Sequence, residues 1–213
     1  MFITFEGIDG AGKTTQVKAL EAYLDAREIP FLSLREPGGT MIGEKIRHLL
    51  KDPKYAPLET ETELFLLSAS RCEILQQKVL PALEEEIWVI LDRYVDSTVA
   101  YQAYGRSLDW EDVEVVNRLA TQGVKPDLTF LLDIEPELAR ERIESRPDAQ
   151  PDRIEEESLD FMRRVRQGYL ALEEQEPKRF IKIDASLSID EMTERILKII
   201  KEWENETHLC HCP

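Results

Sequence analysis

The sequence predicts an α/β fold, a single domain built on a doubly wound parallel sheet. Short apolar stretches alternate with stretches of helical periodicity along all 213 residues, a pattern typical of parallel strands joined by helical crossovers. The stretch 87–91 is apolar and rich in β-branched residues, as expected of a strand buried on both faces. A glycine-rich motif directly follows the first apolar stretch and opens the first helical one, an arrangement typical of this class.

The first half of the chain predicts two strands and three helical stretches. In order, they are strand 2–5, helix 13–27, strand 31–34, helix 41–51 and a long helical stretch 58–82. Val17, Leu20 and Leu24 give the first helix its period. Pro30 ends that helix, and Pro81 is expected to bend the long stretch.

The second half predicts three more strands. In order, the elements are strand 87–91, helices 95–103 and 110–122, strand 128–134, helices 136–145 and 155–175, strand 180–183 and helix 188–204. Ile189, Met192 and Ile196 lie on one apolar face of the last helix. Two prolines make residues 146–153 a loop.

The composition excludes several classes of protein. Hydrophobic residues make up 42% of the chain, which is enough for a sizeable core. The formal net charge is −16, so we expect no nucleic-acid partner and no membrane partner. No apolar run approaches the ~20 residues of a membrane span. The three cysteines, Cys72, Cys210 and Cys212, form no disulfide framework, and a cytoplasmic location is expected.

Residues 7–14 match the phosphate-binding pattern G-x-x-x-x-G-K-[ST]. Glycines let backbone N–H groups surround an anion, and the following helix adds its positive N-terminal end. Lys13 is expected to reach the outer phosphates, and the Thr14 hydroxyl to bind magnesium. The residues expected to hold the nucleotide are Gly7, Ile8, Asp9, Gly10, Ala11, Gly12, Lys13 and Thr14.

Asp92 stands where the buried strand 87–91 ends. Ligands of open α/β sheets bind beyond the carboxyl ends of the strands, so Asp92 is the expected second metal ligand. Arg93 follows at once and can grip a phosphate with its planar fork. Asp133 ends the next strand and competes for the metal, but Pro136 soon after it indicates a helix start, so it ranks second.

Taken together, these motifs resemble those of the bacterial thymidylate kinases, enzymes that convert dTMP to dTDP, over essentially the whole chain. The matching motifs are Gly7–Thr14, Arg35–Thr40, Ser70–Arg71, Asp92–Tyr94, Ser97–Gln102 and Asp152–Glu155. The resemblance implies a P-loop nucleoside-monophosphate-kinase-like fold, with a five-stranded parallel sheet, helices on both faces and a lid loop at about 146–153. It also implies a homodimer that uses ATP and Mg²⁺ in dTTP biosynthesis. We expect one kinase domain over 1–205 and a disordered tail over 206–213.

The resemblance further implies roles for single residues. Asp9 corresponds to the carboxylate that meets the sugar 3′-hydroxyl, and Arg93 to the cation that touches both the acceptor and the transferring phosphate. Arg47 corresponds to a second acceptor-phosphate arginine, and Arg71 to the donor to a thymine carbonyl. Tyr101 corresponds to a tyrosine that crowds the sugar 2′ position. The other expected substrate-binding residues are Glu36, Leu67, Ser97, Thr98 and Gln102.

One position departs from the family pattern. The family usually carries an aromatic residue four positions before the base-reading arginine, where it stacks on thymine, and this chain has Leu67 there. The nearest aromatic residue, Phe65, is two positions before Leu67, which turns it ~200° from the same helix face. We therefore expect weaker stacking on the base.

The catalytic arginine is expected in the lid. One type of thymidylate kinase carries a basic residue inside the P-loop, but that position is Ala11 here. The resemblance is therefore to the type whose mobile lid supplies the arginine, and Arg146 and Arg153 are the expected catalytic residues. An arginine that closes on the transferring group can accelerate transfer ~10³-fold or more. The alternative is an ordinary surface loop held by salt bridges to Glu144 and Glu156.

Three other functions compete with this hypothesis. A kinase of another nucleoside or nucleoside monophosphate would differ in the base and sugar pocket around Arg71, Thr98 and Tyr101. A GTPase-like switch would read guanine through Asn-Lys-x-Asp, but the nearest string, at 124–127, begins with valine. A catalytically inactive nucleotide-binding module is disfavoured by the intact Lys13 and Arg93.

Overall fold

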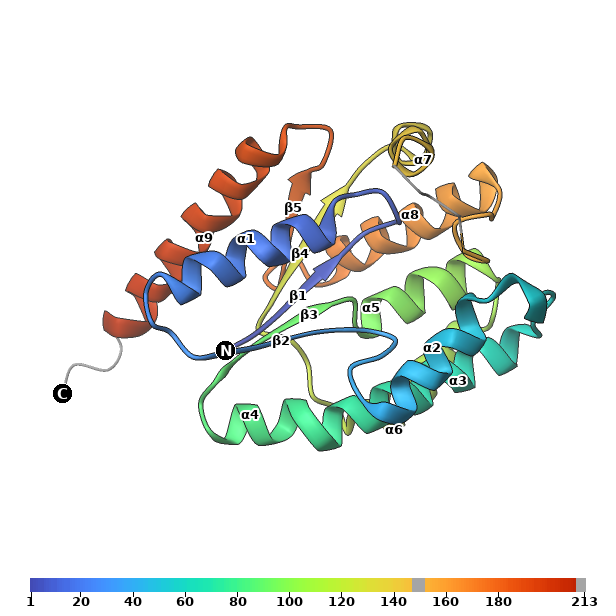
Figure 1. The fold of residues 1–213 in the computed structure, drawn as a ribbon, viewed down its shortest axis with the longest axis horizontal. Coiled ribbons are helices and arrows are strands. Elements are labelled where there is room, and N and C mark those ends of the chain that lie inside the picture. The colour runs from blue at the N-terminus through green and yellow to red at the C-terminus, as the bar shows by residue number, and fades with distance from the viewer. Residues whose placement is uncertain (147–151, 210–213) are drawn as a thin grey trace.

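The centre of the protein is a five-stranded sheet in the order β2-β3-β1-β4-β5, with every neighbouring pair parallel (Figure 1). The computed structural model describes residues 1–146 and 152–209. The strands are β1 (Phe2–Glu6), β2 (Phe31–Arg35), β3 (Trp88–Asp92), β4 (Leu128–Asp133) and β5 (Phe180–Asp184). The α/β class and all five expected strands are confirmed, with each strand end within one residue of its predicted position.

Helices cover both faces of the sheet (Figure 1). On one face α1 (Lys13–Asp25) packs against α9 (Ile189–Leu209). The remaining helices of the described chain are α2 (Met41–Lys51), α3 (Thr60–Ile74), α4 (Leu80–Glu84), α5 (Val95–Thr98), α6 (Trp110–Thr121), α7 (Pro136–Glu144) and α8 (Leu159–Gln175). A short 3₁₀ turn, η1 (Pro53–Tyr55), and two π-helical segments, η2 (Leu75–Val79) and η3 (Val99–Gly105), connect them.

Alternate strand residues feed two separate cores. Phe2 and Leu91 join the smaller core, where the strands meet η2 and α4. Ile3, Phe5 and Ile90 join the larger core, which extends to α1, α8 and α9. This period of two follows from the pleat of the strands. Each such side chain, fully buried, contributes roughly 1.5–3 kcal/mol to folding, so the sheet is fixed from both sides.

Two predicted helices have different limits in the structure. The stretch 58–82 forms α3, the π turn η2 and α4 in succession. Pro81 has no N–H to donate and its ring crowds the preceding turn, and the wider π turn just before it accommodates both effects. The prediction that a helix starts at 155 is wrong, because α8 starts at Leu159, where Ser158 caps it by accepting from the backbone N–H of Phe161.

The structure describes only part of the predicted lid and part of the predicted C-terminal tail. Helix α9 continues to Leu209, past the position 206 where the sequence predicts a tail. Residues 210–213, and residues 147–151 of the expected lid, lie outside the described residues. None of the described helices combines the length and apolar character needed to cross a bilayer.

Strand order brings the two predicted phosphate motifs together. Strands β1 and β3 are neighbours, and Phe5 is paired with Asp92 in register. The loop that follows β1 and the residues that follow β3 are therefore neighbours at the same edge of the sheet. The chain crosses over β1 between β3 and β4, which makes this edge the switch point where ligands of such sheets bind.

Candidate functional site

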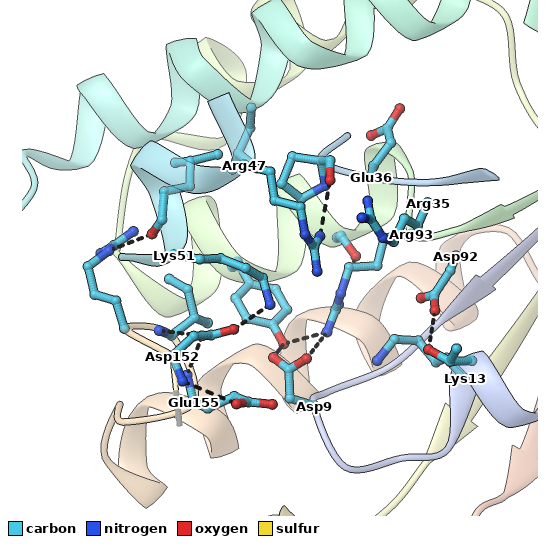
Figure 2. A pocket seen from close by; sticks show the side chains of 18 of the residues that line it. Asp9, Lys13, Arg35, Glu36, Arg47, Lys51, Asp92, Arg93, Asp152 and Glu155 are labelled. Atoms are coloured by element: carbon cyan, nitrogen blue, oxygen red, sulfur yellow. Dashed lines mark hydrogen bonds and ion pairs between the residues drawn. The ribbon is translucent and has the colours of Figure 1, made fainter. Parts of the chain in front are cut away.

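A cavity of about 470 Å³ opens at the carboxyl ends of β1 and β3 (Figure 2). Most residues singled out from the sequence line it. They are Asp9, Gly10, Gly12, Lys13, Thr14, Glu36, Arg47, Leu67, Arg71, Asp92, Arg93, Ser97, Thr98, Tyr101, Gln102, Arg146 and Arg153. Gly7, Ile8 and Ala11 do not line it; Ile8 and Ala11 point into the protein and are buried.

The glycine-rich loop needs glycine at two positions for geometric reasons. Gly7 and Gly10 both have positive φ, at 136° and 84°. A Cβ on Gly7 would lie 2.5 Å from the carbonyl oxygen of Leu132, and one on Gly10 would lie 2.4 Å from that of Ala139. The loop thus fits closely against β4 and α7, and α1 begins at Lys13 directly behind it. This geometry places the N-terminus of α1 beside the loop, where it could bind an anion.

Lys13 is buried and folds back onto its own loop. Its Nζ donates to the carbonyl oxygens of Gly7 at 3.0 Å and Ile8 at 2.9 Å. Burial first, and then the charge of Arg93, lower the pKa of Lys13 to about 8. The amine therefore still carries its charge at neutral pH, and a bound phosphate would be a stronger partner than these carbonyls.

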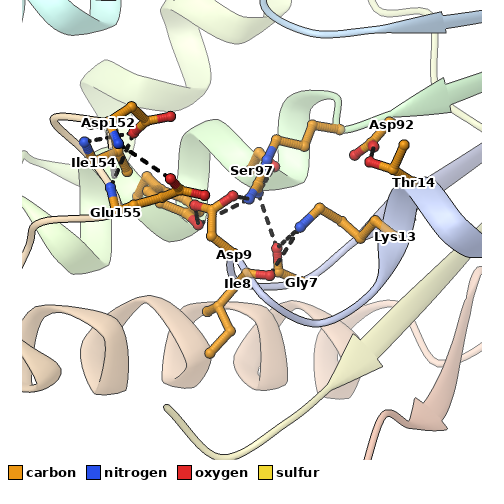
Figure 3. A network of polar contacts seen from close by, with 12 residues as sticks. Gly7, Ile8, Asp9, Lys13, Thr14, Asp92, Ser97, Asp152, Ile154 and Glu155 are labelled. Atoms are coloured by element: carbon orange, nitrogen blue, oxygen red, sulfur yellow. Dashed lines mark hydrogen bonds and ion pairs between the residues drawn. The ribbon is translucent and has the colours of Figure 1, made fainter. Parts of the chain in front are cut away.

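Thr14 and Asp92 meet across the sheet edge. The Thr14 hydroxyl donates to Asp92 Oδ2 at 2.7 Å (Figure 3). Both are hard oxygen ligands of the kind that Mg²⁺ accepts beside nucleotide phosphates. Asp133, the second-ranked metal candidate, instead receives two hydrogen bonds from Arg166, at 2.6 and 3.1 Å. Asp133 is thus engaged by a bidentate arginine and, unlike Asp92, is not among the residues that line the cavity.

Arg93 is the centre of the polar network in the cavity. Its backbone has φ of 75°, a strained conformation that functional sites often hold. Its Nη2 donates to Asp9 Oδ1 at 2.9 Å and to the Tyr101 hydroxyl at 3.1 Å. Its Nη1 lies 3.0 Å from each of three acceptors, Gly7 O, Ser97 Oγ and Tyr169 Oη. The guanidinium is thus preorganised over the glycine-rich loop.

Asp9 is ionised by its surroundings. Its carboxylate accepts from Arg93 on one oxygen and from the Tyr101 hydroxyl at 3.0 Å on the other (Figure 2). Burial acts to raise the pKa of Asp9, but the charges of Arg93, Lys13 and Lys51 outweigh it and hold that pKa well below its usual range. Asp9 is therefore an acceptor at any physiological pH.

Glu6, which the sequence analysis did not single out, contacts Ser97 and Tyr169, the two hydroxyl groups to which Arg93 Nη1 donates. This buried carboxylate accepts from Tyr94 N at 2.7 Å and from Ser97 Oγ at 2.6 Å. Burial, and then the charge of Asp96, raise the pKa of Glu6 to about 7. The Ser97 hydroxyl, expected to bind substrate, donates into this network instead, and it can offer a ligand only its oxygen lone pairs.

Arg71 is buried and makes four hydrogen bonds to protein groups. Nε donates to Glu36 Oε2 at 2.7 Å and Nη2 donates to Tyr94 O at 2.9 Å. Nη1 donates to Thr98 Oγ1 and to Asn117 Oδ1. Nη2 also forms an ion pair with Glu36 at 2.7 Å. Arg71 and Thr98 both line the cavity.

The other pocket residues agree with the helix geometry expected from the sequence. Leu67 lines the cavity, whereas Phe65 is 60% exposed and turns away from it. Arg47 also lines the cavity, and its Nη1 donates to Pro37 O at 3.0 Å. An aliphatic side chain thus occupies the position where the family pattern has an aromatic ring, and the loop after β2 holds Arg47.

The two expected lid arginines differ sharply. Arg146 has a side chain that is 47% exposed, and it pairs with Glu155 at 2.8 Å. Arg153 is buried: Nε donates to Leu50 O at 2.8 Å and Nη2 pairs with Glu63. Arg153 also lines the cavity, but a swing over the phosphates would require it to leave its buried ion pair with Glu63, and breaking such a pair is costly.

Several further charged residues line the cavity. Asp152 and Glu155 belong to the motif at 152–155, and Lys51 and Glu63 were not singled out from the sequence. Lys51 Nζ pairs with Asp152 (Figure 2). A charged residue on an amphipathic helix is usually solvated, so spacing alone could not distinguish Lys51 and Glu63. Within the described residues, no three His, Cys, Asp or Glu side chains gather as a further metal site.

Comparison with known proteins agrees with this geometry. The family model "Thymidylate kinase" matches residues 5–196. A thymidylate kinase from Thermoanaerobacter sp. (strain X514) is 46% identical over 202 residues, covering 95% of this chain and 98% of the relative. One from Kosmotoga olearia is 46% identical over 198 residues, covering 93% and 94%. The crystal structure of thymidylate kinase from Ehrlichia chaffeensis superposes with a TM-score of 0.76 at 33% identity, covering 94% and 98%.

Proposed function

The chain belongs to the thymidylate kinase family, and from this premise we propose how its side chains transfer the γ-phosphoryl group of ATP to dTMP. The products are dTDP and ADP, and the dTDP serves dTTP biosynthesis. The observation that carries the assignment is a single cavity with the glycine-rich loop at one end and the Arg71 pocket at the other. Arg93 and Asp9 lie between the two ends. Donor and acceptor phosphates can therefore meet in line over one arginine.

The donor end is built from the loop and α1. Backbone N–H groups of residues 7–14 surround the ATP phosphates, and Lys13 leaves the carbonyls of Gly7 and Ile8 to pair with them. Thr14 and Asp92 would hold Mg²⁺, because their paired oxygens match its preference for hard ligands. When bound there, the ion neutralises charge on the phosphates.

The acceptor end is built around Arg93. Its guanidinium takes the dTMP phosphate and the transferring group together, and Arg47 from α2 takes a second edge of the acceptor phosphate. Asp9 accepts from the sugar 3′-hydroxyl, since its carboxylate stays ionised. Tyr101 fills the space beside Asp9, where a 2′-hydroxyl would have to fit. Phosphoryl transfer then depends mainly on positioning and charge.

The base lies among Leu67, Arg71, Thr98 and Gln102. Arg71 reaches a thymine carbonyl by exchanging its hydrogen bond to Thr98, and Thr98 then turns to the base edge. Leu67 packs on the ring face with its methyl groups. An aliphatic contact imposes less specific geometry on the base than a stacked aromatic ring does. Selection of the base therefore depends more on hydrogen bonds in this enzyme.

Arg146 supplies the lid charge. It is exposed, lines the cavity and forms an ion pair with Glu155. Closure of the loop would exchange that carboxylate for a phosphate, with water excluded at the same time. Arg153 anchors the base of the lid instead, by its contacts with Leu50 and Glu63.

The active species is a homodimer. Exposed apolar side chains on three helices support this: Met41 of α2 is 78% exposed, Phe65 of α3 is 60% exposed and Leu119 of α6 is 71% exposed. Helix α3 packs between α2 and α6 (Figure 1), so these helices form one side of the molecule. Large exposed apolar side chains on one side favour a protein partner.

An assay of ADP release across acceptors tests the function. The purified enzyme should consume ATP with dTMP as acceptor, and much more slowly with dAMP, dGMP or thymidine. Activity with thymidine but not dTMP would identify a nucleoside kinase. No ADP release with any acceptor would instead make the chain a binding module.

A further inference from the structure

Glu6, the last residue of β1, is a buried carboxylate that no step of the proposed reaction uses. It is 0% exposed and is not among the residues that line the cavity. Its Oε2 accepts from the Ser97 hydroxyl at 2.6 Å and from the Tyr169 hydroxyl at 3.2 Å. Arg93 Nη1 donates to these same two hydroxyl oxygens, at 3.0 Å each. Glu6 and Arg93 are therefore linked through two shared hydroxyl groups.

The number of hydrogens in this cluster decides how the two hydroxyls are oriented. The Ser97 and Tyr169 oxygens are 2.8 Å apart, so each of them lies within hydrogen-bond distance of the other and of Glu6 Oε2. An ionised carboxylate can only accept, and a guanidinium can only donate. Both hydroxyl hydrogens therefore point into the cluster, and both oxygens present lone pairs to Arg93.

A proton on Glu6 changes this arrangement. Glu6 Oε1 accepts from the backbone N–H of Tyr94 at 2.7 Å, whereas Oε2 lies beside the two hydroxyls. The protonated carboxyl group therefore donates to a hydroxyl oxygen, and its hydrogen takes up a lone pair that Arg93 would otherwise use. The negative charge that polarises both hydroxyls is lost at the same time, which weakens their hydrogen bonds from Arg93.

Charged and titratable groups on four elements face Glu6. Burial and the charge of Asp96, on α5, raise the pKa of Glu6, while Arg93, just after β3, acts to lower it, and the result is about 7. Burial holds the pKa of the Tyr169 phenol, on α8, well above its ordinary value, so this hydroxyl keeps its proton. Lys13, at the start of α1, is itself influenced by the charge of Glu6. Glu6 is therefore close to half-ionised at neutral pH.

We propose that Glu6 is a positioning residue for phosphoryl transfer: through the hydroxyls of Ser97 and Tyr169, its carboxylate holds the Arg93 guanidinium in the orientation that binds the transferring phosphate. This inference rests on the proposed kinase function and assigns Glu6 a role within it. Arg93 contacts the phosphates, and Glu6 acts on the reaction only through Arg93. Because the ionised form of Glu6 is the one that orients both hydroxyls, the rate of transfer should rise with pH as Glu6 loses its proton.

Glu6→Gln tests the proposal because it imitates the protonated carboxyl group at every pH. The carboxamide oxygen can keep the hydrogen bond from Tyr94 N, and the NH₂ group then lies at the Oε2 position and donates to the hydroxyls. The measurement is the single-turnover rate of transfer from ATP to dTMP, which excludes product release. The native rate should exceed that of the variant about tenfold at pH 8, as expected for one charge-assisted hydrogen bond, and only about twofold at pH 6, where native Glu6 is mostly protonated. An equal ratio at both pH values would indicate a merely structural loss and would overturn the proposal.

Glu61→Gln is the matched control. It makes the same chemical change in an exposed carboxylate of α3, so its transfer rate should equal the native rate at pH 6 and at pH 8. Ionisation of the dTMP phosphate affects all of these enzymes alike and cancels in the ratios. A loss at pH 8 as large as that in Glu6→Gln would attribute the effect to net charge and refute the proposal.

A variant without the two hydroxyls separates an effect through Arg93 from an effect through Lys13. Ser97→Ala combined with Tyr169→Phe removes both links between Glu6 and Arg93. Adding Glu6→Gln to this double variant should lower the transfer rate at pH 8 no further. A further tenfold drop would mean that Glu6 acts through Lys13 or through the fold, and the proposal would be wrong.

The same double variant keeps the test decisive if Glu6→Gln does not fold. Its transfer rate at pH 8 should lie about tenfold or more below the native rate, because Arg93 Nη1 has lost both hydroxyl acceptors. A native rate in the folded double variant would refute the positioning role. If the native enzyme does not phosphorylate dTMP at any pH, the proposed function fails; if it does so and the ratios do not change with pH, only the role of Glu6 fails.

Discussion

Arg93 and Asp9 form a 2.9 Å ion pair that joins the residue after β3 to the middle of the glycine-rich loop. Both residues line the cavity, and their side chains point toward each other (Figure 2). It keeps Asp9 ionised and aims the guanidinium, while Gly7 O and Tyr169 hold the other nitrogen. A phosphate that enters finds an arginine already oriented, which reduces reorganisation during transfer.

Lys13→Ala should lower kcat at least ~10²-fold. The charge of Lys13 has most effect when negative charge develops on the transferring group, and the amine stays protonated with a pKa of about 8. Steady-state kinetics with thermal unfolding as a folding check provide the measurement. Lys18→Ala, on the exposed side of the same helix, should leave kcat unchanged. Near-native turnover in the Lys13 variant would rule out this donor site.

The buried carboxyl of Glu6 should make stability depend on pH. Its pKa is raised to about 7 in the folded protein, against an unfolded value near 4.3. Between these values the folded state binds more protons, so this contribution is fully present below about pH 4 and is lost as pH rises through 7. Urea unfolding at pH 5 and pH 8 should show the native protein losing on the order of 2–3 kcal/mol more than Glu6→Gln.

A surface variant makes the Glu6 measurement specific. Glu61→Gln removes an exposed carboxylate and should follow the native pH profile. If Glu6→Gln also follows the native profile, then Glu6 does not titrate between pH 5 and 8.

The local sequence was sufficient to predict the fold and the phosphate-binding end of the cavity. The glycine-rich loop, Lys13 and Asp92 are fixed by backbone geometry at strand ends, and such geometry follows from residue type and spacing. The sheet follows for the same reason, because its strands are apolar and short and its crossovers helical.

Side-chain partners over long sequence separations could not be predicted in the same way. Glu63 and Arg153 are 90 positions apart, and Glu6 and Tyr169 are 163 apart. Nothing local distinguishes Arg153, which is buried and paired, from Arg146, which is exposed. The expected catalytic role of Arg153 was inferred from its position in a loop, and the sequence holds no sign of the buried pair with Glu63 that the structure shows.

Tyr101 should exclude ribose. If its ring crowds the 2′ position, dTMP should be used in preference to the ribonucleotide, and Tyr101→Ala should weaken that preference. Tyr101→Phe separates size from hydrogen bonding, because it keeps the ring and loses the bond to Asp9. We expect the Phe variant to retain the sugar preference and lose some turnover. The measurement is kcat/KM for both acceptors, and equal use of both sugars by the native enzyme would refute the assignment.

The side formed by α2, α3 and α6 should be the dimer interface. Phe65→Asp places a charge among exposed apolar side chains and should convert the dimer to a monomer in light scattering after gel filtration. Ile189→Asp is the matched control, since Ile189 is 56% exposed but lies on α9, on the other side of the sheet (Figure 1). A native protein that is monomeric at micromolar concentration would contradict the homodimer.

Arg146 and Arg153 should fail in different ways when each is replaced by alanine. The Arg146 side chain is exposed and lines the cavity, so its loss should lower kcat ~10²-fold or more in single-turnover assays with little change in thermal unfolding. Lysine at position 146 should restore little of the rate, because it lacks the planar fork that grips phosphate oxygens.

Arg153 is buried against Glu63 and Leu50, and Arg153→Ala leaves that carboxylate with Arg106 as its remaining cation. Breaking a buried pair in this way costs about 3–5 kcal/mol. We therefore expect a lower unfolding temperature, with phosphoryl transfer in the folded fraction closer to the native rate than in Arg146→Ala. Calorimetric unfolding and single-turnover transfer, measured on both variants, separate the two roles. The reverse pattern, a stable Arg153→Ala enzyme with abolished transfer beside a fully active Arg146→Ala enzyme, would mean that Arg153 leaves Glu63 during the reaction and supplies the lid charge itself.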